Sequence, residues 1–168
     1  MCGIVISVFA GLGKTYVGKK YLNVCDLQSS PYRYDYSKID KNDYEKKKND
    51  LSRIVNPLWP NNYLDAIIDA REKYDVVLVP SNLDIRELLI SNHIDFYFIL
   101  PSYDLDYREI LLNRYKKRGN NNDLIQEVMS YFDSWSRDQN DYSYPIFVLD
   151  KEMYLEDFLL NKKILWVL

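Results

Sequence analysis

The stretch Ile4-Val5-Ile6-Ser7-Val8-Phe9-Ala10-Gly11-Leu12-Gly13-Lys14-Thr15 decides the fold of this 168-residue chain. Its first six residues are almost all apolar and rich in β-branched side chains, as is typical of strands that helices cover on both faces. The glycines that follow predict a turn, and residues 14–22 can form a short helix before a second apolar stretch at residues 23–27. The order strand, glycine turn, helix, strand predicts a βαβ unit.

The same alternation continues along the rest of the chain. Short apolar runs predict further strands at residues 76–79, 94–100 and 145–149. Apolar residues at helical spacing predict helices at residues 62–74, 83–92, 104–117, 123–137 and 153–160. Residues 164–168 are expected to add an edge strand or a packed tail. Apolar strands alternating with helices predict a three-layer α/β/α fold with a five-stranded, mainly parallel sheet.

The length predicts a single domain, residues 1–168, with one core. Two segments interrupt the regular alternation. Residues 28–60 are polar and contain three prolines that break long elements, so we interpret them as an insertion. Residues 104–140 hold two helices with no strand between them, and we expect them to form a helical lid over the carboxyl ends of the strands. Open α/β sheets bind their ligands at that edge.

Composition excludes several classes of protein. The chain is 47% hydrophobic and 28% charged with a net charge of -3, values typical of soluble globular proteins. No apolar run approaches the roughly 18 residues that a membrane span requires, and no secretory signal precedes the first strand, so we expect a cytoplasmic protein without a membrane partner. The acidic balance argues against broad binding to duplex nucleic acid. Cys2 and Cys25 are expected to be buried thiols, and with His93 they are too few for a zinc site.

Residues 8–15 have nearly the spacing of a phosphate-binding loop, and they stand between a strand and a helix as that motif requires. Glycines allow backbone N–H groups to surround phosphate oxygens, and the start of the helix adds partial positive charge. Lys14 is predicted to reach the β and γ phosphates, and Thr15 to hold Mg²⁺. The consensus has a glycine in place of Val8, and we expect this change to alter the loop's shape more than its binding. The alternative is a glycine turn that binds no nucleotide.

With these residues the sequence resembles the nucleoside and nucleotide kinase branch of the P-loop proteins, and most of all the small kinase-like proteins of bacteriophages. The resemblance rests on Gly11-Leu12-Gly13-Lys14-Thr15, on Asp26 at the end of the second strand, and on the segment 114–118. It implies an enzyme that transfers the γ-phosphoryl group of ATP, with Mg²⁺, to a nucleotide or nucleoside-like acceptor. Residues 11–15 would hold ATP, and residues 28–60 would lie on the acceptor side. A virus-encoded enzyme of this kind would act in the host cytoplasm.

Asp26, at the end of the second predicted strand, and Arg33, which follows it, are candidates for contact with the acceptor. In such kinases an acidic residue at the place of Asp26 meets the acceptor, and a carboxylate near an attacking hydroxyl can accept its proton. The alternative is an aspartate that caps a turn with Ser29 or Ser30. Arg33 can bind an acceptor phosphate or stack on a base. The tyrosines around Arg33 are expected to cover apolar surface instead.

Arg114 and Arg118 are four residues apart on a predicted helix, so they project from the same face. In the lids of such kinases an arginine pair closes over the transferring phosphate and neutralises its charge. The alternative is a solvated basic helix end. Residues 80–82, after the third strand, lack an acidic residue that would position Mg²⁺, so Asp26 can serve the metal through water. The candidate catalytic residues are Lys14, Asp26, Arg114 and Arg118.

Two other functions stay open at this point. A kinase that acts on a hydroxyl group in DNA or on a modified base would have a basic, open groove beside residues 28–60. A nucleotide-binding interaction protein would keep the loop without catalysis. A switch GTPase is not supported, because the chain has neither an Asp-x-x-Gly segment nor an Asn-Lys-x-Asp motif.

Overall fold

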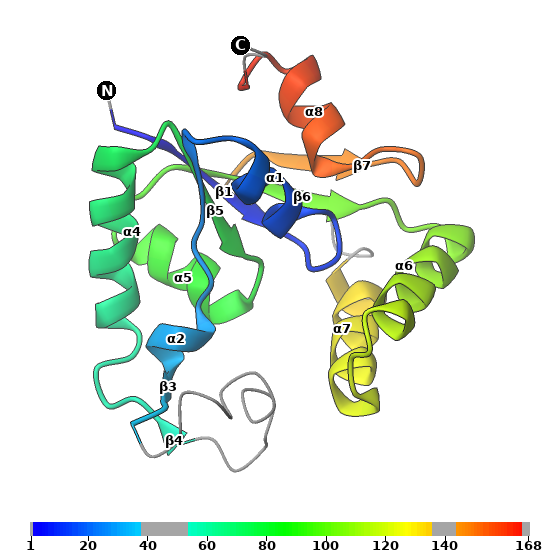
Figure 1. The fold of residues 1–168 in the computed structure, drawn as a ribbon, viewed down its shortest axis with the longest axis horizontal. Helices are drawn as coiled ribbons and strands as arrows, with labels where there is room; N and C mark the ends of the chain where they lie inside the picture. The colour runs from blue at the N-terminus through cyan, green and yellow to red at the C-terminus, as the bar shows by residue number, and fades with distance from the viewer. Residues whose placement is uncertain (1, 38–53, 136–143, 166–168) are drawn as a thin grey trace.

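The computed structural model describes residues 2–37, 54–135 and 144–165, which form one main sheet flanked by helices (Figure 1). Its strands are β1 (Ile4–Val8), β2 (Val24–Asp26), β5 (Val76–Pro80), β6 (Phe96–Pro101) and β7 (Ile146–Leu149). They lie in the order β2-β5-β1-β6-β7, and every neighbouring pair is parallel. The predicted α/β fold with a five-stranded parallel sheet is therefore confirmed.

The helices also follow the sequence pattern. They are α1 (Lys14–Lys20), α2 (Ser30–Arg33), α4 (Asn61–Lys73), α5 (Leu83–Ser91), α6 (Leu105–Lys117), α7 (Asn122–Trp135) and α8 (Leu155–Asn161). All except α2 were predicted, within a few residues of these bounds. The last two residues of the predicted helix 123–137 lie outside the described ranges. No helix in these ranges is long and apolar enough to cross a membrane.

Crossover connections place helices on both faces of the sheet. The chain moves towards one edge from β1 to β2, and towards the other edge from β2 to β5 and from β5 to β6. Because parallel crossovers are almost always right-handed, α1 lies on one face and α4 and α5 lie on the other. Helix α8 packs beside α1, where the hydroxyl of Tyr21 donates to Glu156 at 2.6 Å. Figure 1 shows α6 and α7 beyond the carboxyl ends of the strands.

The centre of the sheet fixes where the loop after β1 emerges. Val5, Ile6 and Val8 of β1 have no exposed surface, because β5 and β6 flank the strand and helices cover it. Full burial of such a side chain stabilises the fold by about 1.5–3 kcal/mol. The loop that follows is therefore anchored to a buried central strand.

The segment 28–60 contains more structure than its polar sequence indicates. Pro31 stands in the first turn of α2, where a missing N–H costs nothing. Two short strands follow, β3 (Tyr34–Asp35) and β4 (Ile54–Val55), which pair antiparallel. Residues 38–53 of the predicted insertion lie outside the described ranges. None of the described elements in this segment is long, as the prolines predicted.

The prediction of two buried thiols is wrong for Cys2. Cys2 is exposed because it precedes β1, whose pairing with neighbouring strands begins at Ile4. Cys25 lies in β2 and is partly buried against the core, and both thiols are free. At the other end of the chain, residues 164 and 165 form no strand, and residues 166–168 lie outside the described ranges.

Candidate functional site

The glycine loop, residues 9–13, connects β1 to α1. Val8 does not belong to it: Val8 is buried, pairs with Pro80 and Ile99, and so extends β1 by one residue where the phosphate-loop consensus has a glycine. Gly11 and Gly13 have φ angles of 86° and 108°, a backbone conformation that glycine adopts without strain. The two positions of this loop that require glycine therefore have it.

Backbone hydrogen bonds hold the glycine loop in place. The N–H of Phe9 donates to the carbonyl oxygen of Ile99 at 3.0 Å. Leu12 is completely buried, and its carbonyl oxygen accepts from the N–H of Leu155 at 3.0 Å. The loop is thus fixed to β6 on one side and to the start of α8 on the other. A loop fixed in this way presents its backbone to a ligand without reorganising.

Thr15 and Asp26 meet at the carboxyl end of β2. The Thr15 hydroxyl donates to Oδ2 of Asp26 at 2.8 Å. Oδ1 of Asp26 is buried and has no hydrogen-bond partner within the described ranges, although a buried carboxylate oxygen without one is costly. No hydrogen bond links Asp26 to Ser29 or Ser30 there, so the turn-capping interpretation is not supported. Asp26 therefore has one oxygen free for a ligand.

Lys14 lies beside this pair without being neutralised by it. Its side chain is half-buried and makes no hydrogen bond or ion pair with the described residues. Burial lowers the pKa of Lys14, the negative charge of Asp26 opposes that shift, and the positive charge of Arg118 adds to it. A partly buried lysine without an ion-pair partner among the described residues, and with a perturbed pKa, is a candidate for binding an anion.

The two arginines of α6 both line a pocket beside the glycine loop. Nη1 of Arg114 donates to the carbonyl oxygen of Gly11 at 3.3 Å. The guanidinium carbon of Arg114 lies 4.5 Å from the centre of the Tyr154 ring, a cation–π distance. Arg118 is exposed at the end of α6 and has no side-chain partner in the part of the chain that the structure describes. Arg118 is therefore free to reach an anion on the loop.

Two adjoining pockets lie against the glycine loop. The first, the loop pocket, has a volume of about 500 Å³. It is lined by Ala10, Gly11, Gly13, Lys14, Thr15, Tyr16, Tyr115, Arg118 and Asn120. The second, the side pocket, has a volume of about 470 Å³ and is lined among others by Leu12, Arg114, Arg118 and Tyr154. Arg118 lines both, so the pockets form one continuous site around the loop.

Tyr115 and Asn120 also belong to the loop pocket, and sequence reasoning missed them. The Tyr115 hydroxyl and the Asn120 side-chain oxygen are buried without a hydrogen-bond partner among the described residues. A Cβ atom on Gly11 would come within 2.8 Å of the Tyr115 hydroxyl, so this hydroxyl lies directly over the loop. Burial raises the pKa of Tyr115, which keeps the hydroxyl protonated as a donor. The sequence signal that could have identified Tyr115 was a tyrosine at an apolar helix position between two arginines.

A groove extends from the loop on the other side of Lys14. Its inner part has a volume of about 150 Å³ and includes Lys14, Asn82, Glu127 and Tyr131 in its lining. Its outer part has a volume of about 660 Å³. The outer part is lined by Ser29, Ser30, Arg33, Tyr34, Asn82, Leu83, Asp84, Glu87, Leu124, Glu127 and Tyr131. The groove thus leads from Lys14 to α2, the segment in which the acceptor contact was expected.

Arg33 lies in the outer part of the groove and is already paired. Its Nη1 is 3.1 Å from a carboxylate oxygen of Asp84, and its guanidinium carbon is 5.4 Å from the centre of the Trp59 ring. Of the tyrosines near Arg33, Tyr32 packs against Tyr63, as expected for a residue that covers apolar surface. Tyr34 differs because it lines the groove. The structure therefore gathers the other candidate residues at the loop and places Arg33 apart from them.

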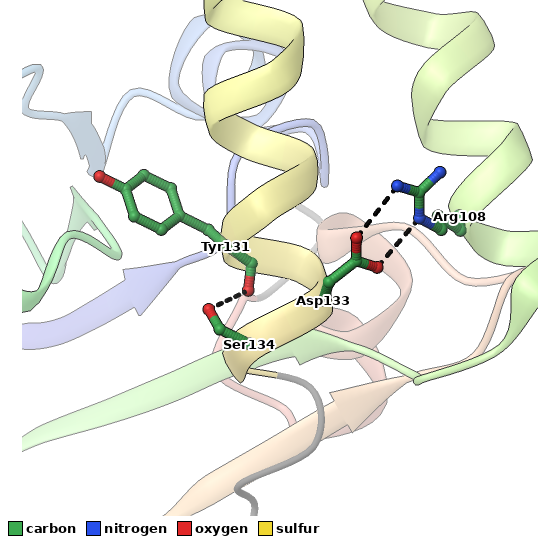
Figure 2. Close-up of polar contacts among 4 residues, drawn as sticks. All are labelled: Arg108, Tyr131, Asp133 and Ser134. Carbon is green, nitrogen blue, oxygen red and sulfur yellow. Dashed lines mark hydrogen bonds and ion pairs between the residues drawn. The ribbon is translucent and has the colours of Figure 1, made fainter.

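Helix α7 contacts α6 and also lines the groove. Figure 2 shows Arg108 of α6 donating two hydrogen bonds, both 3.0 Å long, to the carboxylate of Asp133 on α7. A bidentate pair of this kind fixes both distance and orientation. In the same view the ring of Tyr131 projects from the opposite side of α7. One side of α7 thus holds α6 and α7 together, while the other side forms a wall of the groove.

No model of a known protein family matches this chain, and no curated protein matches it either. The site is therefore described by its own chemistry. Around a fixed glycine loop it holds a lysine, an arginine and a tyrosine hydroxyl that have no partner among the described residues, together with a hydroxyl–carboxylate pair. The lysine, the arginine and the tyrosine hydroxyl can each donate a hydrogen bond to an anion.

Proposed function

We propose that this chain is a small P-loop kinase, which binds ATP at Gly11 to Thr15 and transfers the γ-phosphoryl group to a nucleotide or nucleoside-like acceptor. One observation carries the proposal: Lys14, unpaired among the described residues, opens α1 between the Thr15–Asp26 pair and Arg118. Positively charged side chains and hydrogen-bond donors surround a space there that is large enough for a polyphosphate. ATP is an intracellular donor, so we place the reaction in the cytoplasm, that of a host cell if a virus encodes the chain.

In this proposal the loop pocket holds the phosphates of ATP and the side pocket holds its adenine base. In the loop pocket Lys14, Arg118 and the Tyr115 hydroxyl are donors for the β and γ phosphates. The side pocket has a guanidinium and a ring on its walls, from Arg114 and Tyr154, and these offer flat surfaces for the adenine base. This division supports a nucleoside triphosphate as the donor in preference to a simple phosphate ion.

The residues present fit Mg²⁺. Thr15 uses its proton in the bond to Asp26, so the lone pairs of its oxygen remain free for a cation. Oδ1 of Asp26 is a second oxygen without a partner in the described ranges. Mg²⁺ is commonly held by one or two protein oxygens together with water and substrate phosphates, and when bound it neutralises phosphate charge. Thr15 would hold the ion directly, and Asp26 would orient Thr15 and hold the ion's water.

The same groups can assist transfer. Lys14 lines the inner end of the groove and interacts electrostatically with Asp26. In the proposed reaction Asp26 takes the proton of an acceptor hydroxyl as the oxygen attacks the γ phosphorus. Arg118 and Lys14 stabilise the charge that develops on the phosphoryl oxygens. Arg114 contacts the carbonyl oxygen of Gly11, so it ties α6 to the loop on which the phosphates lie. The lid can thus exclude water from the reacting atoms.

Acceptor-dependent formation of ADP in wild type and in Asp26→Asn tests this proposal. We expect wild type to form ADP with Mg-ATP and an acceptor, and Asp26→Asn to lose about 10²- to 10⁴-fold in kcat, the usual contribution of a general base. The control is Asp65→Asn, an exposed aspartate of α4, which should keep full activity. No acceptor-dependent ADP from wild type would contradict the proposal and favour a nucleotide-binding interaction protein.

The groove bears on the second kinase hypothesis, transfer to a hydroxyl in DNA or on a modified base in DNA. That function needs a basic groove beside the segment 28–60, since nucleic acid binding depends on neutralising phosphates. The outer part of the groove is lined by three carboxylates and one arginine among the described residues. This observation favours a small acceptor over a nucleic acid strand.

A further inference from the structure

We propose that Asn82 binds the attacking group of the acceptor and holds it against the γ phosphate of ATP. This inference rests on the proposed phosphotransferase function and adds an acceptor-binding residue to it. Its basis is the place of the Asn82 side chain, which lines both parts of the groove and makes no hydrogen bond with the described residues.

The fold brings Asn82 close to the glycine loop. Strand β5 ends at Pro80, which pairs with Val8, the last residue of β1. The carboxyl ends of these neighbouring strands therefore lie together, and Asn82 follows two residues after Pro80. Lys14 and Asn82 both line the inner part of the groove. Because open α/β sheets bind their ligands at this edge, Asn82 lies where an acceptor would meet the phosphates.

The two parts of the groove differ in size, which indicates how an acceptor lies in it. The inner part has a volume of about 150 Å³, below the roughly 300–1,000 Å³ of typical small-molecule sites, so it has room for one end of a ligand. The outer part, at about 660 Å³, has room for the remainder. Lys14 lines the inner part and also the loop pocket, so the end in the inner part is the reacting end. Since Asn82 lines both parts, the acceptor passes beside it.

Asn82 occupies a position where an asparagine side chain ordinarily has a structural role. It is the N-cap residue of α5, and asparagine there commonly accepts a hydrogen bond from the second or third N–H of the helix. The Asn82 side chain makes no such bond. Its backbone carbonyl oxygen does accept, from the N–H groups of Ile85 and Arg86 at 3.2 and 3.1 Å. The side-chain amide is therefore available to a ligand in the groove.

The chemistry of an amide suits an attacking oxygen. Its N–H groups are donors, and the oxygen of a hydroxyl or of a phosphate has lone pairs that accept from them. In the reaction this oxygen forms a bond to the γ phosphorus as the bond from that phosphorus to the β–γ bridging oxygen breaks, leaving ADP. The proton of an attacking hydroxyl passes to Asp26, as proposed above. Asn82 neither gains nor loses a proton, so its contribution is to hold the acceptor in line.

Asn82→Ala tests the inference through the kinetics of both substrates. Wild type is first supplied with Mg-ATP and with adenosine, cytidine, guanosine, thymidine or one of their 5′-monophosphates, and the acceptor with the highest kcat/KM is used for both proteins. We expect the variant to lower kcat/KM for this acceptor by about fivefold or more, the loss of one hydrogen bond. KM for ATP should stay unchanged, because Asn82 lines neither the loop pocket nor the side pocket. An unchanged kcat/KM for the acceptor, or a loss confined to KM for ATP, would overturn the inference.

Asn92→Ala is the matched control, because it changes the same type of residue at the other end of α5. The Asn92 side chain donates to the carbonyl oxygen of Leu88 at 2.8 Å, so it caps the helix, and it does not line the groove. We expect Asn92→Ala to lower Tm and leave kcat/KM unchanged. Asn82→Ala should do the reverse, with a ligand-free Tm within about 2 °C of wild type. A lower Tm without a kinetic change would make Asn82 a capping residue only.

Failure of this inference can be told apart from failure of the proposed function. If wild type phosphorylates none of these acceptors, the proposed function fails and the inference falls with it. If wild type phosphorylates an acceptor and Asn82→Ala does so equally well, while Mg-ATP raises Tm equally in both proteins, only the inference fails.

Discussion

Tyr115 holds its hydroxyl over the glycine loop without a hydrogen-bond partner in the described part of the chain. An unpaired buried hydroxyl costs about 1–3 kcal/mol, so its presence points to a ligand that completes it. The loop pocket supplies the place for that ligand, between Lys14 and Arg118. A change at Tyr115 should therefore weaken ligand binding without lowering the stability of the ligand-free protein.

Tyr115→Phe should lower kcat/KM for ATP by at least about tenfold, because a hydrogen bond to a charged group contributes about 1.5–3 kcal/mol. Tm of the ligand-free variant should not fall, since the change removes a buried hydroxyl that has no hydrogen-bond partner among the described residues. Steady-state kinetics and thermal unfolding check the two parts. Tyr97→Phe, at the amino end of β6, is the control and should alter neither. A lower Tm with unchanged kcat/KM would assign the hydroxyl a structural role.

Helix α1 and strand β2 approach each other closely, and this contact sets the geometry between Thr15 and Asp26. A Cβ atom on Gly18 of α1 would lie 2.7 Å from Cβ of Asp26, a distance that requires the helix or the strand to shift. Because Thr15 is on the same helix, such a shift would also disturb its 2.8 Å hydrogen bond to Asp26. The packing of two elements thus determines the position of a candidate metal ligand.

Gly18→Ala should therefore lower both Tm and phosphoryl transfer. Helix propensity alone would stabilise the variant by about 1 kcal/mol, whereas overpacking costs about 1–3 kcal/mol, and the clash with Asp26 should prevail. Thermal unfolding and kcat are the measurements. Lys19→Ala, an exposed change in the same helix, is the control and should shift stability by no more than about 0.5 kcal/mol. A higher Tm with full activity would contradict this account of the contact.

The main elements were predictable because their signals are local. The buried strands are apolar runs, and the glycines of the loop stand where positive φ angles occur. Helix α2 and strands β3 and β4 were missed because elements of two to four residues leave no periodicity to detect. Cys2 was misjudged because an apolar neighbourhood in sequence does not ensure neighbours in space.

The site was predictable only in part, since sequence indicates residue types but not their partners. Lys14, Thr15 and the arginines of α6 followed from a motif and from helical spacing. The bond between Thr15 and Asp26 depends on how α1 lies on β2, and the pairing of Arg33 with Asp84 depends on how α2 meets α5. Such contacts arise from tertiary packing. The contact with Asp84 shows that Arg33 is a paired cation, whereas the sequence alone suggested a free one.

At the scale of the whole molecule, β1 places the glycine loop beside the loop pocket, the side pocket and the inner part of the groove. The loop and side pockets lie on one side of Lys14, and the groove lies on the other. Helices α6 and α7, fastened by Arg108 and Asp133, supply residues to both sides. Binding of a nucleoside triphosphate at this junction is the central claim of the account.

Thermal unfolding with and without Mg-ATP, in wild type and in Lys14→Ala, tests that claim most directly. A ligand that binds only the native state stabilises it by about 2.7 kcal/mol at one hundred times its Kd. For a protein of this size that corresponds to a rise in Tm of roughly 5–10 °C. We expect this rise in wild type and little or none in Lys14→Ala. No rise in wild type at millimolar Mg-ATP, or an equal rise in both proteins, would contradict the assignment of the glycine loop as a nucleotide site.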